Sequence, residues 1–254
     1  MLELNKIYCG DCLDLMREMP DKCVDLVLTD LPFGTTQNEW DIPIPFDPMW
    51  EQICRIKKEN TAILFFGSGM FTAELMASNK KLWKYNLIWV KNRSTGFLNA
   101  ASMPLRSHED IIVFYSSLPI YHPQMSRGNK NHSRGSVSTA KNNCYGDFDV
   151  SFETNRTGNM KFPDSVLFFD RAHPPIHPTE KPVPLLEYLI RTYSNEGDII
   201  LDFCCGSGTT AEASIRTCRN FIGIEKEPAY VAIAEKRLEK VNNHKITDFF
   251  GVHE

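Results

Sequence analysis

The sequence has 254 residues, of which 42% are hydrophobic and 24% are charged, and its formal net charge is −4. These values are ordinary for a soluble globular chain and argue against a protein coated in basic residues, although a local basic face is enough to bind nucleic acid. No run of 18 apolar residues is present and the first residues do not resemble a signal peptide, so we expect no membrane span and a cytoplasmic location.

The eight cysteines lack a regular spacing, which indicates reduced thiols. Cys9 and Cys12 have the spacing of a metal-binding or redox pair, and no second such pair follows in the sequence. We therefore expect no bound metal. The length suits one large α/β domain with an insertion, or two small domains.

The first half of the chain alternates short apolar runs with amphipathic segments. We predict strands at 7–9, 24–29, 62–67, 85–90 and 110–115, and helices at 13–19, 49–58 and 71–79. Asp11 lies at the end of the first strand, where it is either a helix cap or an acceptor for the amino group of a ligand. The alternation predicts a largely parallel sheet.

One tetrapeptide, Asp30-Leu31-Pro32-Phe33, follows the buried strand at 24–29. Pro32 and Gly34 end that strand, so the tetrapeptide is presented at a carboxyl end, where open α/β sheets bind ligands. Asp30 and the Leu31 carbonyl can accept both hydrogens of an amino group on an aromatic ring, and Phe33 can stack on that ring. The alternative is an ordinary turn in which Asp30 is a local cap.

Two polar segments carry more basic than acidic side chains. The segment 91–106 contains no acid, and the segment 117–164 has few apolar residues with which to build a core. The second segment is either a surface insertion or a segment that orders on nucleic acid, with cations for phosphates and aromatic rings for stacking. The candidate DNA contacts of the two segments are Lys91, Arg93, Arg106, Arg127, Lys130 and Arg134.

The last third contains a glycine turn between predicted strands at 199–203 and 221–225, with helices at 185–193, from the turn to about 217, and at 228–241. Gly206 and Gly208 allow a ligand to approach the backbone, and Glu225 can accept hydrogen bonds from ribose hydroxyls. This unit predicts a nucleoside site, but its spacing also fits an NAD-dependent oxidoreductase. Only one strand and one helix follow the turn, so the sheet must be completed from the amino-terminal half, which favours the first interpretation.

Together the motifs resemble those of the β-class DNA amino-methyltransferases, which use S-adenosylmethionine. The family's catalytic D-P-P-Y motif corresponds to 30–33, its H-P-T-x-K-P motif is present at 177–182, and its D-x-F-x-G-S-G-T-T motif corresponds to 202–210. The resemblance covers nearly the whole chain except 117–164. It implies a Rossmann-like, doubly wound mixed α/β sheet in permuted order.

The same resemblance implies the domain organisation and the site residues. The catalytic half would be 1–116, the target-recognition insertion 117–164 and the cofactor-binding half 165–254. Asp30 and the Leu31 carbonyl would hold the target amino group, Phe33 would stack the flipped base, and Pro32 would complete their turn. The residues around the cofactor would be Asp11 at the adenine, Glu225 at the ribose, Thr179 and Lys181 near the carboxylate, and Asp202, Phe203, Gly206, Ser207 and Gly208 at the methionine end.

Two positions depart from the family pattern, because Leu31 replaces the first proline and Cys204 stands where Phe is common. Asp30 at the first motif position resembles adenine-specific members. The resemblance therefore implies methylation of adenine N6 in double-stranded DNA with base flipping, by an enzyme that resembles homodimeric members. Restriction–modification, phage self-protection and regulatory methylation all remain open as its role. Cytosine-N4 methylation and a catalytically inactive DNA-binding protein are the alternatives.

Overall fold

The computed structural model describes residues 2–36, 38, 41–128, 159–172 and 180–250, with side chains described as far as residue 243. The chain forms two compact units, one comprising Met1–His122 and Asp164–Glu254 and the other Pro123–Pro163. In the smaller unit, β6 (Ser126–Arg127) pairs antiparallel with β7 (Met160–Lys161). The larger unit contains the other described helices and strands.

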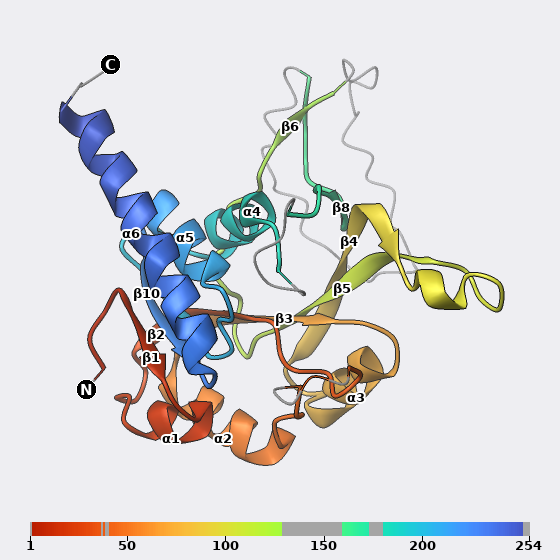
Figure 1. Ribbon diagram of the computed structural model, residues 1–254, viewed down its shortest axis with the longest axis horizontal. Helices are drawn as coiled ribbons and strands as arrows, with labels where there is room; N and C mark the ends of the chain where they lie inside the picture. Colours follow the sequence, from red (N-terminus) through yellow and green to blue (C-terminus); the bar gives the residue numbers. More distant parts are fainter. Residues whose placement is uncertain (1, 37, 39–40, 129–158, 173–179, 251–254) are drawn as a thin grey trace, which may run out of the picture. The chain divides into compact units, whose positions relative to one another are not determined.

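The larger unit is built on one mixed sheet (Figure 1). Among the described strands of this sheet, β5 alone runs antiparallel to its neighbours. The predicted doubly wound sheet in permuted order is confirmed, because β2 and β9 lie side by side although they come from opposite halves of the chain. In spatial order the strands are β1 (Lys6–Cys9), β10 (Asn220–Glu225), β9 (Ile199–Asp202), β2 (Val24–Thr29), β3 (Lys57–Gly67), β5 (Arg106–Phe114), β4 (Trp83–Thr95) and β8 (Val166–Phe168).

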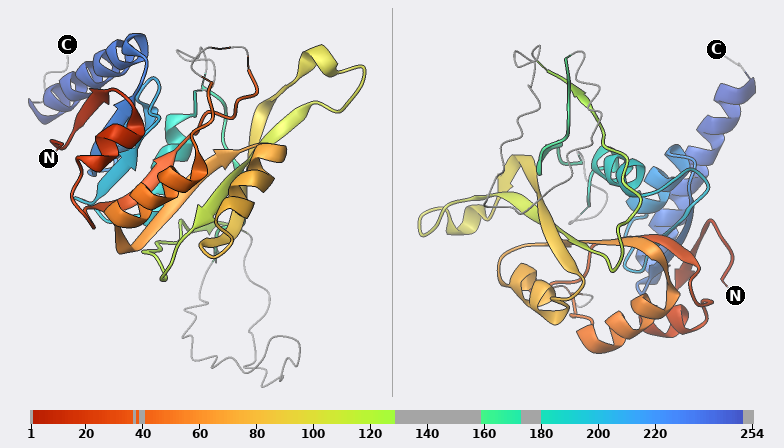
Figure 2. Two further views of the ribbon diagram at one scale, coloured as in Figure 1. Left: turned by 90° about the horizontal axis from the view of Figure 1, so that it is seen from below. Right: turned by 180° about the vertical axis from the view of Figure 1, so that it is seen from behind.

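Helices cover both faces of the sheet (Figures 1 and 2). They are α1 (Cys12–Arg17), α2 (Phe46–Ile56), α3 (Met70–Ser78), α4 (Val183–Tyr193), α5 (Thr209–Arg216) and α6 (Pro228–Phe250), with a 3-10 turn, η1, at Phe97–Asn99. The first three pack with one face of β2 and β3, whereas α4 and α5 pack with the other. None of the described helices is both long and apolar enough to cross a membrane.

The central strands are apolar on both faces because both faces are covered. In β2, Val27 belongs to the core under α1 to α3, whereas Leu26 and Leu28 belong to the core under α4 and α5. All three side chains are fully buried. A strand that is covered on both faces needs a continuous run of apolar residues. The apolar run at 24–29 is therefore enough to predict β2 from the sequence.

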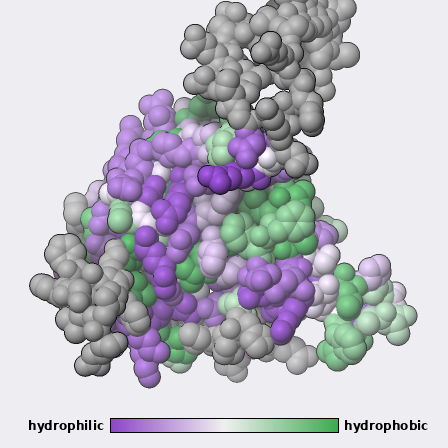
Figure 3. Space-filling view, turned by 90° about the horizontal axis from the view of Figure 1, so that it is seen from above, coloured by the Kyte–Doolittle hydropathy of each residue, from purple (hydrophilic) through white to green (hydrophobic). Residues whose placement is uncertain are grey.

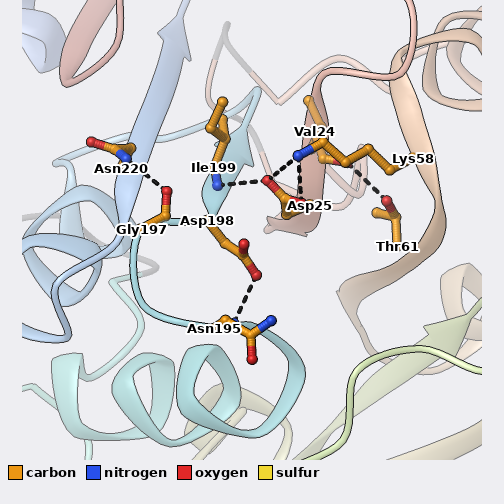
Figure 4. Close-up of polar contacts among 9 residues, drawn as sticks. All are labelled: Val24, Asp25, Lys58, Thr61, Asn195, Gly197, Asp198, Ile199 and Asn220. Carbon is orange, nitrogen blue, oxygen red and sulfur yellow. Dashed lines mark hydrogen bonds and ion pairs between the residues drawn. The ribbon is translucent and has the colours of Figure 1, made fainter.

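Polar contacts join the two halves of the chain at the amino edge of the sheet (Figure 4). The Asp25 carboxylate accepts a hydrogen bond of 3.0 Å from the Ile199 amide and contacts the Lys58 ammonium at 2.7 Å. The Thr61 hydroxyl donates to the Val24 carbonyl at 2.8 Å. These contacts fix β2 between β3 and β9, so the opposite, carboxyl ends of the same strands are held in register.

The structure adds two features to the predicted elements. First, β4 and β5 extend into the predicted loop 91–106 and pair as far as Thr95 and Arg106, which makes a long hairpin. Second, β8 pairs with β4 at the edge of the sheet. Three residues are too few to show an alternation, so this strand could not be recognised from sequence. Pro45 and Pro48 explain why α2 begins before the predicted helix at 49–58, because proline favours the first turn of a helix.

Candidate active site

The predicted tetrapeptide lies where β2 leaves the sheet at its carboxyl edge. Leu31 is buried in the core, whereas Phe33 is half-buried and borders the cavity described below. The Phe33 ring stacks on Phe71, with ring centroids 4.5 Å apart and an interplanar angle of 27°. Phe71 belongs to α3, so a helix supports the aromatic residue of the motif from behind.

The turn after the tetrapeptide is fixed by one glycine and one carboxylate. Gly34 has a φ of +67°, and a Cβ there would lie 2.6 Å from a carbon of Pro43, so a side chain is excluded. The Asp41 carboxylate accepts hydrogen bonds from the Gly34 and Thr35 amides at 2.8 and 2.9 Å, and from the Thr36 amide at 2.7 Å. Three backbone donors on one carboxylate hold the loop against the site.

Four charged side chains meet beside the motif. The Lys181 ammonium contacts Asp30 Oδ2 at 2.5 Å and Glu109 Oε2 at 3.4 Å. Lys91 contacts Glu109 Oε1 at 2.5 Å, and both lysine side chains are at most 8% exposed. The two carboxylates and the two ammonium groups of this cluster therefore neutralise one another's charge. The Lys181 ammonium also lies 4.9 Å from the centre of the Phe66 ring.

The pKa shifts of this cluster follow from burial and from neighbouring charges. Burial raises the pKa of Asp30, and Lys181 only partly opposes the rise. Burial also acts to raise the pKa of Glu109, but Lys181 and Lys91 outweigh it and the net direction is downward. For Lys181, burial favours the neutral amine, yet Asp30 and Glu109 raise its pKa. Lys181 is therefore the cation that keeps two buried carboxylates compatible.

Asp202 ends β9 next to this cluster. Its Oδ1 accepts hydrogen bonds from the Thr29 hydroxyl and, at 3.2 Å, from the Cys204 amide. The same Thr29 oxygen accepts from the Phe203 amide at 2.9 Å, so β2 and β9 are tied at their carboxyl ends. Burial raises the pKa of Asp202 to about 6, and a hydrogen bond from Thr210 acts in the opposite direction.

Glu225 and Asp11 hold the neighbouring turns. Glu225 ends β10 and accepts hydrogen bonds from the Gly206 amide at 2.8 Å and from the Glu227 amide at 2.9 Å. Burial raises the pKa of Glu225. Asp11 Oδ1 caps α1 by accepting from the Leu13 amide at 2.9 Å. Both acids thus have a structural role in the protein, and both also border the cavity.

A second buried cluster supports the glycine turn, and sequence analysis missed it. Arg237 of α6 contacts Glu180, donates to Glu212 of α5 at 2.8 Å and reaches Ser207 Oγ at 3.5 Å. Glu180 immediately precedes Lys181, so this arginine links the glycine turn to the lysine of the first cluster. A single arginine within a helix carries no sequence signal for such a role.

These elements enclose a cavity of about 430 Å³ along the carboxyl edge of the sheet. This volume is in the range of small-molecule sites. The structure brings eleven of the predicted catalytic and cofactor residues to its wall: Asp11, Asp30, Leu31, Pro32, Phe33, Lys181, Asp202, Phe203, Gly206, Ser207 and Glu225. Cys204, which departs from the family pattern, also lines the cavity, beside Cys12. The Cys12 thiol, together with burial, raises the pKa of Cys204.

Phe203, Gly208 and Thr179 complete the set of predicted cofactor residues. The Phe203 ring also borders the cavity but is buried in the core, edge-on to Phe65 with centroids 6.2 Å apart. Gly208 has a φ of +78°, and a Cβ there would lie 2.8 Å from that of Ala234, so this glycine lets α6 pack on the turn. Thr179 lies outside the described residues.

The predicted DNA contacts divide into three groups. Arg93, Arg106 and Arg127 are exposed. Lys91 is buried, its ammonium contacts Glu109, and the residue lines the cavity. Lys130 and Arg134 lie outside the described residues.

A doubly wound sheet with a glycine turn, paired acids and a cavity at its carboxyl edge defines an α/β protein that binds a nucleoside-containing ligand. The sequence matches the DNA methylase family N6_N4_Mtase over residues 24–236, and the chain belongs to this family. The family assignment decides against the NAD-dependent alternative.

Individual relatives agree with this assignment. The chain is 27% identical to the Type II methyltransferase M.HinfI of Haemophilus influenzae, over 94% of this chain and 69% of that protein. Its fold is similar to that of the M1.HpyAVI–SAM complex, with a TM-score of 0.62, 21% identity and coverage of 91% and 98% of the two chains. It is also similar to the PvuII DNA methyltransferase, described as cytosine-N4-specific, with a TM-score of 0.65, 15% identity and coverage of 93% and 89%.

The protein is therefore a DNA methyltransferase that uses S-adenosylmethionine. Among the described residues, no group of three or more His, Cys, Asp and Glu side chains is arranged to hold a metal ion.

Proposed function

We propose that the chain methylates N6 of adenine at a specific sequence in double-stranded DNA, with the target base flipped into the cavity beside Asp30. One observation carries this proposal. Asp30 borders the cavity, its Oδ1 is buried and has no hydrogen-bond partner among the described residues, and its Oδ2 is held by Lys181. A buried carboxylate oxygen without a donor is costly, and an incoming amino group supplies that donor.

The residues of the cavity fit S-adenosylmethionine. Asp202 offers a carboxylate to the ammonium of its methionine end, Gly206 offers close approach, and Glu225 and Asp11 lie on the wall further along the sheet. When bound, the cofactor supplies a methyl group activated by a positively charged sulfur. The acids at the wall suit a ligand that carries two positive charges.

The chain's own residues then act on the target amine. Asp30 Oδ1 accepts one N–H, and the carbonyl of Leu31, next in the chain, is proposed to accept the other. As the amine becomes positively charged, the fixed carboxylate stabilises that charge. Phe33, supported by Phe71, offers a surface on which the flipped base stacks. Asp30 can also accept the proton that the methylated nitrogen loses.

Adenine is proposed over cytosine because aspartate in the first motif position resembles adenine-specific enzymes. Cytosine-N4 is the second candidate, since the family includes both chemistries and one similar fold is described as cytosine-N4-specific. The test is to expose unmethylated DNA to the protein, digest it to nucleosides and separate these by mass spectrometry. N6-methyldeoxyadenosine supports the proposal, and N4-methyldeoxycytidine overturns the choice of base.

Sequencing of the same methylated DNA gives the recognition sequence. A fixed sequence context is the expected result for the modification enzyme of a restriction–modification system. A catalytically inactive DNA-binding protein would leave no methylated nucleoside in either measurement. As DNA contacts we propose Arg93 and Arg106 in the larger unit and, separately, Arg127, Lys130 and Arg134 in the smaller one.

Asp41→Ala is expected to slow methyl transfer about 10-fold or more without weakening cofactor binding. The change removes the acceptor of three backbone hydrogen bonds, each worth on the order of 1 kcal/mol, and frees the turn behind Phe33. Steady-state rates and calorimetric titration with S-adenosylmethionine measure the two effects. Asp47→Ala, at an exposed carboxylate of α2, is the matched control; equal loss in both variants would contradict this role.

Cofactor binding is expected to tighten as the pH rises through about 6. The pKa of Asp202 is raised to about 6 by burial, so the carboxyl is neutral below that pH and cannot pair with an ammonium group. Affinity should fall by up to about tenfold per pH unit below this point. The Asp202→Asn variant should bind S-adenosylmethionine weakly at all pH values. Its affinity should not show the rise near pH 6 that ionisation of Asp202 gives the wild type. Burial also raises the pKa values of Glu225 and Asp30. The effect of Asp202 is therefore the difference between the pH dependence of cofactor affinity in the wild type and that in Asp202→Asn. Parallel curves would contradict the assignment.

A further inference from the structure

The hairpin of β4 and β5 exposes large apolar side chains. Between the strands, at 96–105, Phe97 is 82% exposed and Leu98 is 100% exposed. Met103 and Leu105 are 57% and 40% exposed. The hairpin projects from the sheet at the right of Figure 1, and Figure 3 shows hydrophobic residues gathered on the lobe at the same side. The tip of the hairpin, residues 96–105, is therefore apolar, and the described residues of its own unit do not cover it.

The charged residues next to this tip in the chain are all basic. Arg93 and Arg106 are exposed on the two strands, and no Asp or Glu occurs from residue 91 to residue 108. Apolar side chains between exposed cations fit a partner that is anionic outside and apolar inside, as a DNA duplex is, with phosphates around stacked bases. The same arrangement disfavours a second copy of this chain, because a twofold contact would place the arginines of the two tips near one another.

The base of the hairpin is part of the active-site wall. Thr95, Arg106 and His108 line the cavity, and Glu109 follows directly and contacts Lys181. Lys181 in turn contacts Asp30. A duplex whose target base enters this cavity must therefore pass along the hairpin, so its apolar tip lies within reach of the base pairs next to the flipped nucleotide.

We propose that the tip of this hairpin inserts Phe97 and Leu98 into the duplex beside the flipped base. This inference rests on the proposed function. Flipping removes a base from the stack and leaves its neighbours and its former partner without a stacking surface. Apolar side chains that fill the gap replace part of the lost stacking, and they favour the open state without touching the amine that reacts. Phe97 and Leu98 are thus positioning residues for base extrusion.

The test compares two DNA substrates once the recognition sequence is known. One is the ordinary duplex, and the other carries an abasic nucleotide opposite the target base, so that the base is already unpaired. Phe97→Ser combined with Leu98→Ser should slow methylation of the ordinary duplex about 10- to 100-fold, the range expected for one lost stacking contact. On the abasic duplex the rate should return to within about threefold of the wild-type rate, because extrusion there is cheap.

Controls separate this role from others. Leu118→Ser changes an 80% exposed leucine beyond the other end of β5 and should behave as the wild type on both substrates. Unchanged cofactor affinity and thermal unfolding show that the double variant is folded. Equal loss on both substrates, or no loss on either, overturns the insertion. Loss of a dimer in light scattering with equal loss of activity would assign the tip to a second copy instead. Failure of the wild type to methylate any DNA removes the proposed function itself, which distinguishes the two failures.

Discussion

Asp30→Ala is expected to lower the rate of methyl transfer by about 10³-fold or more while cofactor affinity and the fold persist. The reason is that Oδ1 is proposed as the acceptor for the target amine: it is buried and has no hydrogen-bond partner among the described residues, while Lys181 holds Oδ2. Glu109 Oε2 also lacks a hydrogen bond, but it lies 3.4 Å from the Lys181 ammonium. Removal of one preorganised polar group costs about 10²–10³ in rate, and we propose that Asp30 both holds the amine and stabilises its charge.

The measurement is transfer of radiolabelled methyl groups to DNA, with cofactor binding followed by calorimetry. Asp30→Asn keeps the shape and loses the negative charge, so it should be nearly as slow. Asp14→Ala, at an exposed carboxylate of α1, should leave the rate unchanged. An Asp30→Ala protein with the wild-type rate would show that the acceptor lies elsewhere.

Lys181→Met is expected to lower both activity and stability, the first by about 100-fold at neutral pH. Lys181 contacts Asp30 and Glu109, and its loss leaves two partly buried carboxylates with only Lys91 as a cation. Breaking a buried ion pair from one side costs about 3–5 kcal/mol of the free energy of unfolding. Urea unfolding measures this effect.

The pH dependence separates the chemical role of Lys181 from its structural one. Lys181 lowers the pKa of Asp30 against the effect of burial, so its removal raises that pKa further. If the reaction needs ionised Asp30, the acidic limb of the pH–rate profile must move to higher pH in Lys181→Met. Lys181→Arg keeps the cation and should leave that limb near its original place. If the acidic limb of the pH–rate profile lies at the same pH in all three proteins, Lys181 has only a structural role.

The local motifs of this site could be read from the sequence because each depends on neighbours in the chain. The apolar run before Asp30, the glycine turn at Gly206 and the acid Glu225 all occur where a strand ends, and strand ends meet at one edge of a parallel sheet. The identity of that edge as the site therefore follows from order and spacing.

The charge cluster could not be read in this way because its members meet only through tertiary pairing. Lys91 looks like any surface lysine in an acid-free loop, and its burial depends on Glu109 in a strand that pairs antiparallel to its own. Arg237 sits in the last helix, and its partner Glu180 is 57 residues away. A polar pattern distinguishes a strand from a loop, but it does not distinguish a paired cation from a free one.

The seam between β2 and β9 has a consequence for biosynthesis. Asp25 and the Ile199 amide, which bond across this seam, are 174 positions apart. A nascent chain can pair β2 with β3 early, yet the other edge of β2 stays open until the carboxyl-terminal segment has left the ribosome. The proposed acceptor for the base, at the end of β2, and the proposed cofactor site, at the ends of β9 and β10, are thus completed together at the end of translation.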